Sequence, residues 1–362
     1  MLSKSKSRYF KDSIKLIYIS IHVSIGEQRV NKKLIILTIV IVLLISINTV
    51  QAHVPIITEG NESLEDAAHV HDPTKSWAIY SDLPADTVHY YEMEFQEGDR
   101  LKAVLYVPLR SDFVPDLVIM GPEMGRDGEL PENVEVPENY GYIIERGELD
   151  EADYEPFTPA SYYYIAEYDS EVDVEGTYYI AVFDEDGDQG DYGLAVGAEE
   201  RYGILEWINV PLDIVRIRIW EGQGILEIFA PMLVTIAAGL SIFALKKDQG
   251  WSPKNINGWL LSFGGLLYVG SGAMISYQMV KASLIANPGA AVILTLIFAS
   301  IPILIGSLLI LNGVKLEEVL DRKEKVKLVV YGFIGFFAWA GLIVGPIIVI
   351  ISAIFPEKTG FD

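Results

Sequence analysis

The stretch EGTYYIAVFDEDGDQGDYGLAVG, residues 175–197, decides the fold class of the first half of this chain. Apolar and aromatic residues alternate with small or polar ones on both sides of a turn rich in Asp and Gly. A period of two is typical of half-buried strands. The same pattern recurs at 87–95, 101–109 and 161–168. Several short strands separated by turn signals favour an all-β sandwich.

Charge is distributed very unevenly along the 362 residues. The chain has a net charge of −23, whereas the segment 53–200 alone holds 37 acidic and six basic residues. Phosphate contacts require clustered Lys and Arg, so this composition argues against a nucleic-acid partner. The chain contains no cysteine. Disulfides, thiolate nucleophiles and Cys-ligated zinc are therefore excluded.

The N-terminal segment predicts export. An apolar run at 34–50 follows Lys32 and Lys33, and Val50 and Ala52 occupy the −3 and −1 positions of a signal-peptidase site. These features predict a signal region, 1–52, that is cleaved after Ala52. An uncleaved signal anchor is the alternative. Because a long mixed segment precedes the basic residues, we expect that translation starts near Val30.

The second half of the chain predicts a membrane domain. Each of four apolar stretches, 225–245, 256–280, 290–311 and 328–355, reaches the length of about 20 residues that spans a bilayer. Basic residues gather in the first and third links between them, which favours the cytoplasmic side for these links. We therefore expect a multi-pass protein of the cell (plasma) membrane, with the acidic domain 53–200 and the tail 356–362 outside.

The linker 201–224 permits two interpretations. Its segment 211–220, PLDIVRIRIW, mixes apolar residues with arginine and ends in a tryptophan. Such a composition suits a helix in the headgroup layer. It equally suits a last strand or an ordinary linker.

The order of strands and turns in the acidic domain resembles the bacterial pre-peptidase C-terminal domain. The resemblance covers residues 75–198. The residues that carry it are Tyr90-Tyr91, Gly98-Asp99, Asp116-Leu117, Gly176-Thr177-Tyr178-Tyr179 and Gly190-Asp191-Tyr192. It implies a jelly-roll-like sandwich that serves as a binding or accessory module and has no catalytic residues. The acidic segment 127–160 is longer than the connection usual in that family.

Four aspartates form a candidate calcium site. Asp184, Asp186, Asp188 and Asp191 lie in the turn between the last two strands, and alternating carboxylates suit a hard cation. The pattern departs from a helix–loop–helix calcium loop, because Gln189 stands where the glycine belongs. A solvated hairpin tip is the alternative.

Three histidines form a candidate copper site. Cleavage after Ala52 would give His53 a free α-amine, and His69 and His71 share one face of an extended segment. This trio is similar to the copper-binding arrangement of the soluble subunit of particulate methane monooxygenase. Incidental surface histidines are the alternative. Separately, Asn61 begins an N-glycosylation sequon.

Function follows less directly from these patterns. The chain has no nucleophile elbow, phosphate loop or His-Glu-x-x-His motif. The apolar stretches lack ionisable residues except Glu227 at one edge, which argues against a proton-driven pump. We therefore expect a non-enzymatic surface protein whose outer domain binds a surface polymer or another envelope or membrane protein. A transporter or channel subunit capped by the sandwich and a copper-handling protein are the alternatives.

Overall fold

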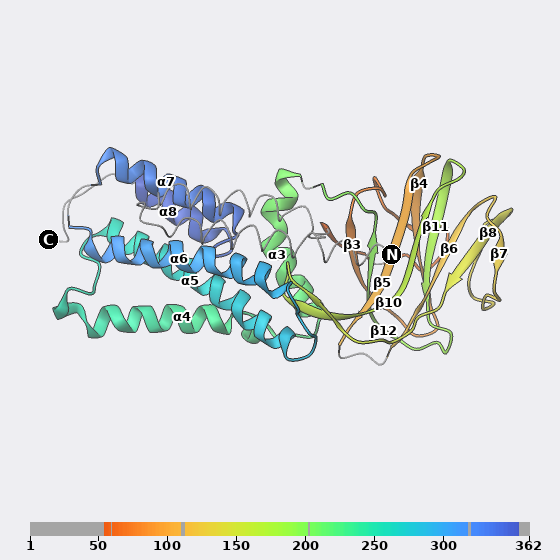
Figure 1. Cartoon of the computed structure of the whole chain (residues 1–362), viewed down its shortest axis with the longest axis horizontal. Helices are drawn as coiled ribbons and strands as arrows, with labels where there is room; N and C mark the ends of the chain where they lie inside the picture. The colour runs from red at the N-terminus through yellow and green to blue at the C-terminus, as the bar shows by residue number, and fades with distance from the viewer. Residues whose placement is uncertain (1–53, 59, 110–112, 202, 318–319, 355–362) are drawn as a thin grey trace, which may run out of the picture. The chain divides into compact units, whose positions relative to one another are not determined.

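The computed structural model describes residues 54–354 except 59, 110–112, 202 and 318–319 (Figure 1). The expected signal region 1–52, His53 and the tail 356–362 lie outside the described residues.

Two six-stranded sheets make up the first half of the described chain (Figure 1). The first sheet has the order β1 (Val54–Ile57), β3 (Trp77–Leu83), β12 (Gly190–Val196), β5 (Arg100–Pro108), β10 (Ala160–Glu171) and β9 (Asp153–Glu155). The second has the order β2 (Ala68–His69), β4 (Val88–Phe95), β11 (Gly176–Phe183), β6 (Asp116–Pro122), β8 (Tyr140–Glu145) and β7 (Arg126–Asp127). The expected all-β sandwich is thus confirmed.

The core lies between the two sheets. Ile79, Leu105 and Leu194 of the first sheet belong to the same fully buried cluster as Ile119 and Ile180 of the second. Because side chains alternate along a strand, the neighbours of these residues point to the opposite face of each sheet. On the first sheet that opposite face carries a row of tyrosines.

The linker 201–224 forms a helix, α3 (Ile204–Trp220), which covers the tyrosine face of the first sheet. Trp220 lies 4.9 Å from the ring of Tyr80 and 6.2 Å from that of Tyr162, between ring centres. Residues 211–220 are therefore helical, whereas their position in the headgroup layer stays a prediction. One side of the helix packs on the sandwich, since Ile217 belongs to the same buried cluster, whereas Ile204, Leu205 and Leu212 are exposed.

The second half of the described chain is helical. It contains α4 (Ile225–Leu245), the short 3-10 helix η2 (Lys247–Gln249), α5 (Ile256–Ser283), α6 (Val292–Lys315), α7 (Arg322–Phe337) and α8 (Val344–Ile354). Among the described residues, α4, α5 and α6 are long and apolar enough to cross a membrane. Most of the apolar stretch of α5 is buried, whereas 17% of that of α4 and 28% of that of α6 is buried.

Glycines allow α5 and α6 to approach closely. Gly258, Gly265 and Gly272 recur every seven residues on α5 and face Gly313, Gly306 and Ala299 of α6. A Cβ atom on Gly265 would lie 2.6 Å from the carbonyl oxygen of Gly306. Small residues at such a seam are typical of helix pairs packed in membranes.

The fourth apolar stretch is not one helix, which corrects the expected single span at 328–355. The chain breaks between α7 and α8, where Trp339, Leu342 and Ile343 adopt positive φ angles of 45°, 54° and 70°. The backbone N–H of Gly341 is satisfied there by Ser271 Oγ of α5 at 2.9 Å. A break at this depth is tolerated because neighbouring helices bind the freed backbone groups.

The helices α7 and α8 form a hairpin (Figure 1). Gly332 of α7 lies against Ile350 of α8, and Val349 of α8 lies against Gly264, in the first third of α5. The described chain therefore returns toward the end of the bundle where Lys254 pairs with Glu317. The expected position of 356–362 on the side of the sandwich assumed that 328–355 crosses the membrane once. The hairpin removes the basis for that expectation.

Candidate functional site

The end of the long acidic insertion packs on the helices. Tyr154 Oη donates to Thr295 Oγ1 of α6 at 2.8 Å, and Thr295 Oγ1 donates to the carbonyl of Pro156 at 2.7 Å. The ring of Phe157 lies 5.4 Å from the rings of both Phe298 and Trp339. The aromatic residues of 154–159 therefore serve in packing between the insertion and the helices.

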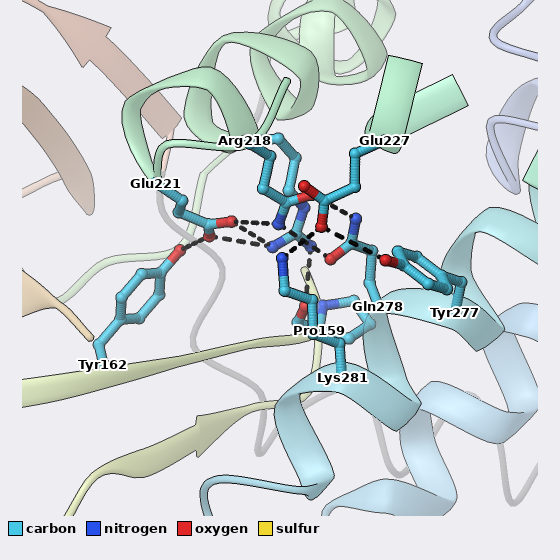
Figure 2. Close-up of polar contacts among 9 residues, drawn as sticks. Pro159, Tyr162, Arg218, Glu221, Glu227, Tyr277, Gln278 and Lys281 are labelled. Carbon is cyan, nitrogen blue, oxygen red and sulfur yellow. Dashed lines mark hydrogen bonds and ion pairs between the residues drawn. The ribbon is translucent and has the colours of Figure 1, made fainter. Parts of the chain in front are cut away.

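Arg218, near the end of α3, forms the centre of a buried polar network (Figure 2). Its Nη1 donates to both carboxylate oxygens of Glu221 at 2.8 and 2.9 Å, and its Nη2 donates to the carbonyl of Pro159 at 2.8 Å. Tyr162 Oη of β10 donates to the same carboxylate at 2.6 Å. These contacts join α3 to the sandwich.

The network continues into the apolar helices through two glutamines. Gln278 lies on α5, and Gln223 lies just before α4. Gln223 Nε2 donates to Gln278 Oε1 at 3.0 Å, and Gln278 Nε2 donates to Gln223 Oε1 at 2.7 Å. Both residues are more than nine-tenths buried. Gln223 Nε2 also donates to Glu221 at 3.0 Å. Ser161 Oγ of β10 donates to the carbonyl of Ala282 at 3.1 Å, which attaches the sandwich directly to the end of α5.

A second ion pair lies beside this network, between the start of α4 and the end of α5 (Figure 2). Lys281 Nζ of α5 donates to Glu227 of α4 at 2.6 Å, and Tyr277 Oη donates to the same carboxylate at 3.3 Å. The one carboxylate at the edge of the apolar stretches is therefore compensated. It fixes α4 against α5.

Electrostatics explain how the buried charges are maintained. Burial is the largest influence on the pKa of Arg218 and lowers it, but Glu221, Tyr162 and Tyr80 together outweigh burial and hold the pKa above its ordinary value. Glu155 behaves differently. Burial raises the pKa of Glu155 to about 7, against the lowering effect of the Phe157 and Thr158 backbone N–H groups and of Arg218.

The network is suited to holding parts together rather than to catalysis. The Glu221 carboxylate accepts from Arg218, Tyr162 and Gln223, so a charge-assisted bond already occupies each oxygen. Such a carboxylate is a fixed structural anion and a poor general base. We call the group Pro159, Tyr162, Arg218, Glu221, Gln223 and Gln278 the junction.

The four predicted calcium ligands do not converge in this structure. Asp184 Oδ1 accepts the backbone N–H groups of Asp186 and Asp188 at 3.0 and 2.9 Å, which closes the hairpin turn before Asp191. Over the described part of the chain, no group of three or more His, Asp or Glu side chains is placed to hold a metal ion. Calcium binding stays a prediction.

The structure brings two of the three predicted copper ligands together. The rings of His69 and His71 lie 4.5 Å apart between centres, and His69 Nδ1 is 3.6 Å from Glu92 Oε2. His53, which would supply the α-amine, lies outside the described residues. Copper binding likewise stays a prediction.

Asn61 is buried, and this corrects the glycosylation hypothesis. Its side chain is 1% exposed, and its Nδ2 donates to the carbonyl of Tyr90 at 3.1 Å. A glycan on that nitrogen would displace Asn61 from the sandwich. The sequon alone could not reveal this, because its three residues say nothing about burial.

The junction residues were not identified from the sequence. Arg218 resembled an ordinary outer-side charge, although its spacing of three from Glu221 is that of a helical ion pair. Gln223 and Gln278 carried no signal at all. Their partners are distant in the chain, so only the assembled structure reveals them.

Comparisons with known proteins give a limited result. No family model and no curated protein matches this chain. The chain is similar to the solved pre-peptidase C-terminal domain of collagenase from Bacillus anthracis, with 15% identity, a TM-score of 0.21, and coverage of 38% of this chain and 99% of that one. It is also similar to PliG from Aeromonas hydrophila, a periplasmic inhibitor of g-type lysozyme, with 14% identity, a TM-score of 0.23, and coverage of 40% and 99%.

The described chain itself defines a class: a two-sheet β-sandwich joined to helices, three of which are long enough to span a membrane.

Proposed function

We propose that this chain is a non-enzymatic membrane protein of the cell surface whose sandwich is a binding or accessory domain. The junction is the observation that carries the proposal. A domain that is merely tethered needs one helix and a flexible linker. Here the linker is the helix α3, and its Arg218 and the adjoining Gln223 are buried in hydrogen bonds to both the sandwich and α5.

The sandwich is thereby held in a fixed orientation on the helices. A ligand or partner bound to it would act on the helices through α3 and the junction. The exposed apolar faces of α4 and α6 are available for lipid and for a partner membrane protein; Leu233 and Val234 of α4 are 53% and 66% exposed. One helix would be enough to anchor the sandwich. We therefore propose that the additional helices serve to bind a partner membrane protein laterally.

The orientation follows from the basic residues. Lys246, Lys247 and Lys254 lie at the end of the bundle reached by α4, away from the junction. Positive charge favours the cytoplasmic side, which supports an outer position for the sandwich. We therefore propose that the protein lies in the cell membrane with its acidic domain exported.

Cysteine labelling tests the orientation, because the chain has no native cysteine. The variants D127C, on β7 of the sandwich, and K247C, at the basic end, would be treated with a membrane-impermeant maleimide on intact cells. We expect D127C to react and K247C to react only after permeabilisation. The reverse pattern would overturn the orientation.

A second experiment tests the association. The full chain would be purified in mild detergent and analysed by mass spectrometry for a membrane protein in stoichiometric amount. V234W alters the exposed face of α4 and L304W that of α6, and at least one of them should lose that partner. K247W, at the exposed basic end and on neither face, serves as the control. A wild-type protein that purifies as a partner-free monomer would contradict the proposal.

A transporter or channel subunit is the second candidate, and the α7–α8 hairpin favours it. Interrupted helices at membrane depth are found in proteins that conduct or transport solutes. Purified protein in liposomes should then move ions or a solute by itself. Absence of flux, together with a stoichiometric partner, would leave the first proposal in place.

A further inference from the structure

A cavity of about 520 Å³ lies between the sandwich and α3. Its volume is within the range of pockets that hold small molecules, roughly 300–1,000 Å³. Its lining residues on these elements come in equal number from the sandwich and the helix. Four lie on β3 and β4 and four on α3, among them Ser81, Asp82, His89, Asp213, Arg216 and Trp220. It is separate from the junction.

The floor of the cavity is polar and fixed. His89 is 3% exposed, and its Nδ1 lies 2.9 Å from Tyr192 Oη and 3.3 Å from Ser81 Oγ. Tyr192 Oη in turn lies 2.5 Å from Tyr91 Oη. Burial lowers the pKa of His89, although Glu62 and Asp82 oppose the shift. A neutral imidazole offers no charge to an anion.

The walls carry an excess of negative charge. Among the described residues that line the cavity, Glu62, Asp82 and Asp213 are acidic and Arg216 is basic. Arg216 Nη1 is 3.1 Å from Asp213 Oδ1, but the arginine side chain is 63% exposed whereas that of Asp213 is 17% exposed. Burial raises the pKa of Asp213 despite Arg216. The carboxylate is thus incompletely compensated, and a bound cation would supply the missing charge.

Two aromatic rings complete the cavity. Tyr80 and Trp220 both line it, with ring centres 4.9 Å apart, and Trp220 Nε1 donates to the carbonyl of Ser81 at 3.1 Å. The hydrogen bond and the packing hold the indole in place. An ammonium group over the face of such a ring is attracted by the ring quadrupole, and more strongly when it is desolvated.

We propose that this cavity binds a small organic cation, a molecule with an ammonium group and a hydrogen-bonding tail. The inference rests on the proposed function, because it names the ligand class of the exported domain. The carboxylates and the aromatic walls would hold the ammonium group, and the polar floor would receive the tail. The domain's large negative charge would attract such ligands over long range. A metal ion suits the cavity less, because the described residues do not bring three ligating side chains together.

Titration calorimetry on the full chain in detergent tests the proposal. The probes are choline, its neutral isostere 3,3-dimethylbutan-1-ol, spermidine and glucose. We expect at least one of the two cations to bind and the neutral isostere not to bind. Failure of both cations, or equal affinity for choline and its isostere, would overturn the proposal. Binding of glucose alone would overturn it in favour of a sugar site.

Charge variants localise the binding to the cavity. D82N and D213N should each weaken cation binding by about fivefold, the equivalent of about 1 kcal/mol. E97Q removes the same charge at an exposed turn away from the cavity and should leave binding unchanged. D213E should bind nearly as well as wild type. Equal weakening by E97Q and D213N would show a non-specific charge effect and contradict a site here.

Trp220 supplies an independent spectroscopic readout. Binding should change the fluorescence of the wild-type chain, and W220F should lose most of that change while it still binds the cation. An unaltered signal in W220F would place the ligand elsewhere. The cysteine-labelling experiment does not depend on the cavity, so loss of this inference and loss of the membrane orientation are distinguishable.

Discussion

Arg218 and Glu221 form an ion pair 2.8 Å long within α3 and its cap, and their side chains are only 4% and 10% exposed. The pair lies between the sandwich and α5. Tyr162 of β10 and the carbonyl of Pro159 complete it from one side, and Gln223 completes it from the other. A buried pair with these extra bonds holds the sandwich, α3 and α5 in place against one another, because each charge depends on partners from several elements.

Removal of one member of this pair should be strongly destabilising. R218M would leave Glu221 buried without its cation, at a cost of about 3–5 kcal/mol in unfolding free energy. R100M removes Arg100 from an exposed ion pair with Asp169 and should cost about 1 kcal/mol or less. Thermal melting of the full chain in detergent, followed by near-ultraviolet circular dichroism, makes the comparison. Similar losses in both variants would show that the junction is not a buried pair.

The double variant R218M/E221Q should lose less stability than the two single variants combined. Each single change leaves an uncompensated buried group, whereas the double change removes both charges. Strict additivity would count against direct coupling.

The stability of the docked insertion should fall as pH rises. Burial raises the pKa of Glu155 from its ordinary 4.5 to about 7, so the folded chain holds a proton that the unfolded chain releases. The stabilisation from the protonated Glu155 is complete below pH 4.5 and is lost as pH rises through about 7. The free energy of unfolding should fall by at most about 3 kcal/mol over this range.

The variant E155Q mimics the protonated acid and should remove this part of the pH dependence. E151Q, a change at an exposed acid of the same insertion, should retain it. Melting temperatures at pH 5 and pH 8 provide the measurement. An identical pH dependence in wild type and E155Q would refute the assignment.

The seam between α5 and α6 should not tolerate a methyl group. G265A would place a Cβ atom 2.6 Å from the Gly306 carbonyl oxygen and 2.9 Å from the Ile310 nitrogen, both in backbone. Separation of the helices should cost about 1–3 kcal/mol. G125A is the matched control, because a Cβ atom there meets nothing within 4 Å. Equal melting temperatures for the two variants would contradict the close packing.

Calcium should raise the melting temperature of the full chain if the aspartate turn binds it. The alternating carboxylates after Asp184 would then move together around the ion. D186N/D188N should remove most of the increase, whereas E171Q/D173N removes two exposed charges elsewhere on the sandwich and should not. An equal calcium response in all three proteins would leave only general charge screening.

Several features could be predicted from the sequence because they depend on consecutive residues. The alternation in 177–183 predicted β11, and the composition of 225–245 predicted α4 with the observed bounds. A local period of hydrophobicity is enough to define such elements, because each one buries its own apolar face. The same reasoning correctly placed His69 and His71 near one another.

The remaining features could not be predicted, because they depend on which distant surfaces meet. Arg218 bonds to Pro159 across 59 positions, and Gln223 pairs with Gln278 across 55. In the sequence such residues look like solvated polar side chains. The break within the apolar stretch 328–355 could not be predicted either. Hydrophobicity indicates only the length of this stretch, whereas contacts with Tyr268 and Ser271 of α5 accompany its folding into α7 and α8.

The amino-acid sequence by itself therefore determined the all-β domain, the apolar helices and their order, because local patterning specifies elements. Only the tertiary structure decided the burial of Asn61, the junction around Arg218 and the cavity above His89. A polar side chain becomes a structural bond or a binding surface only when packing removes it from water and supplies its partners.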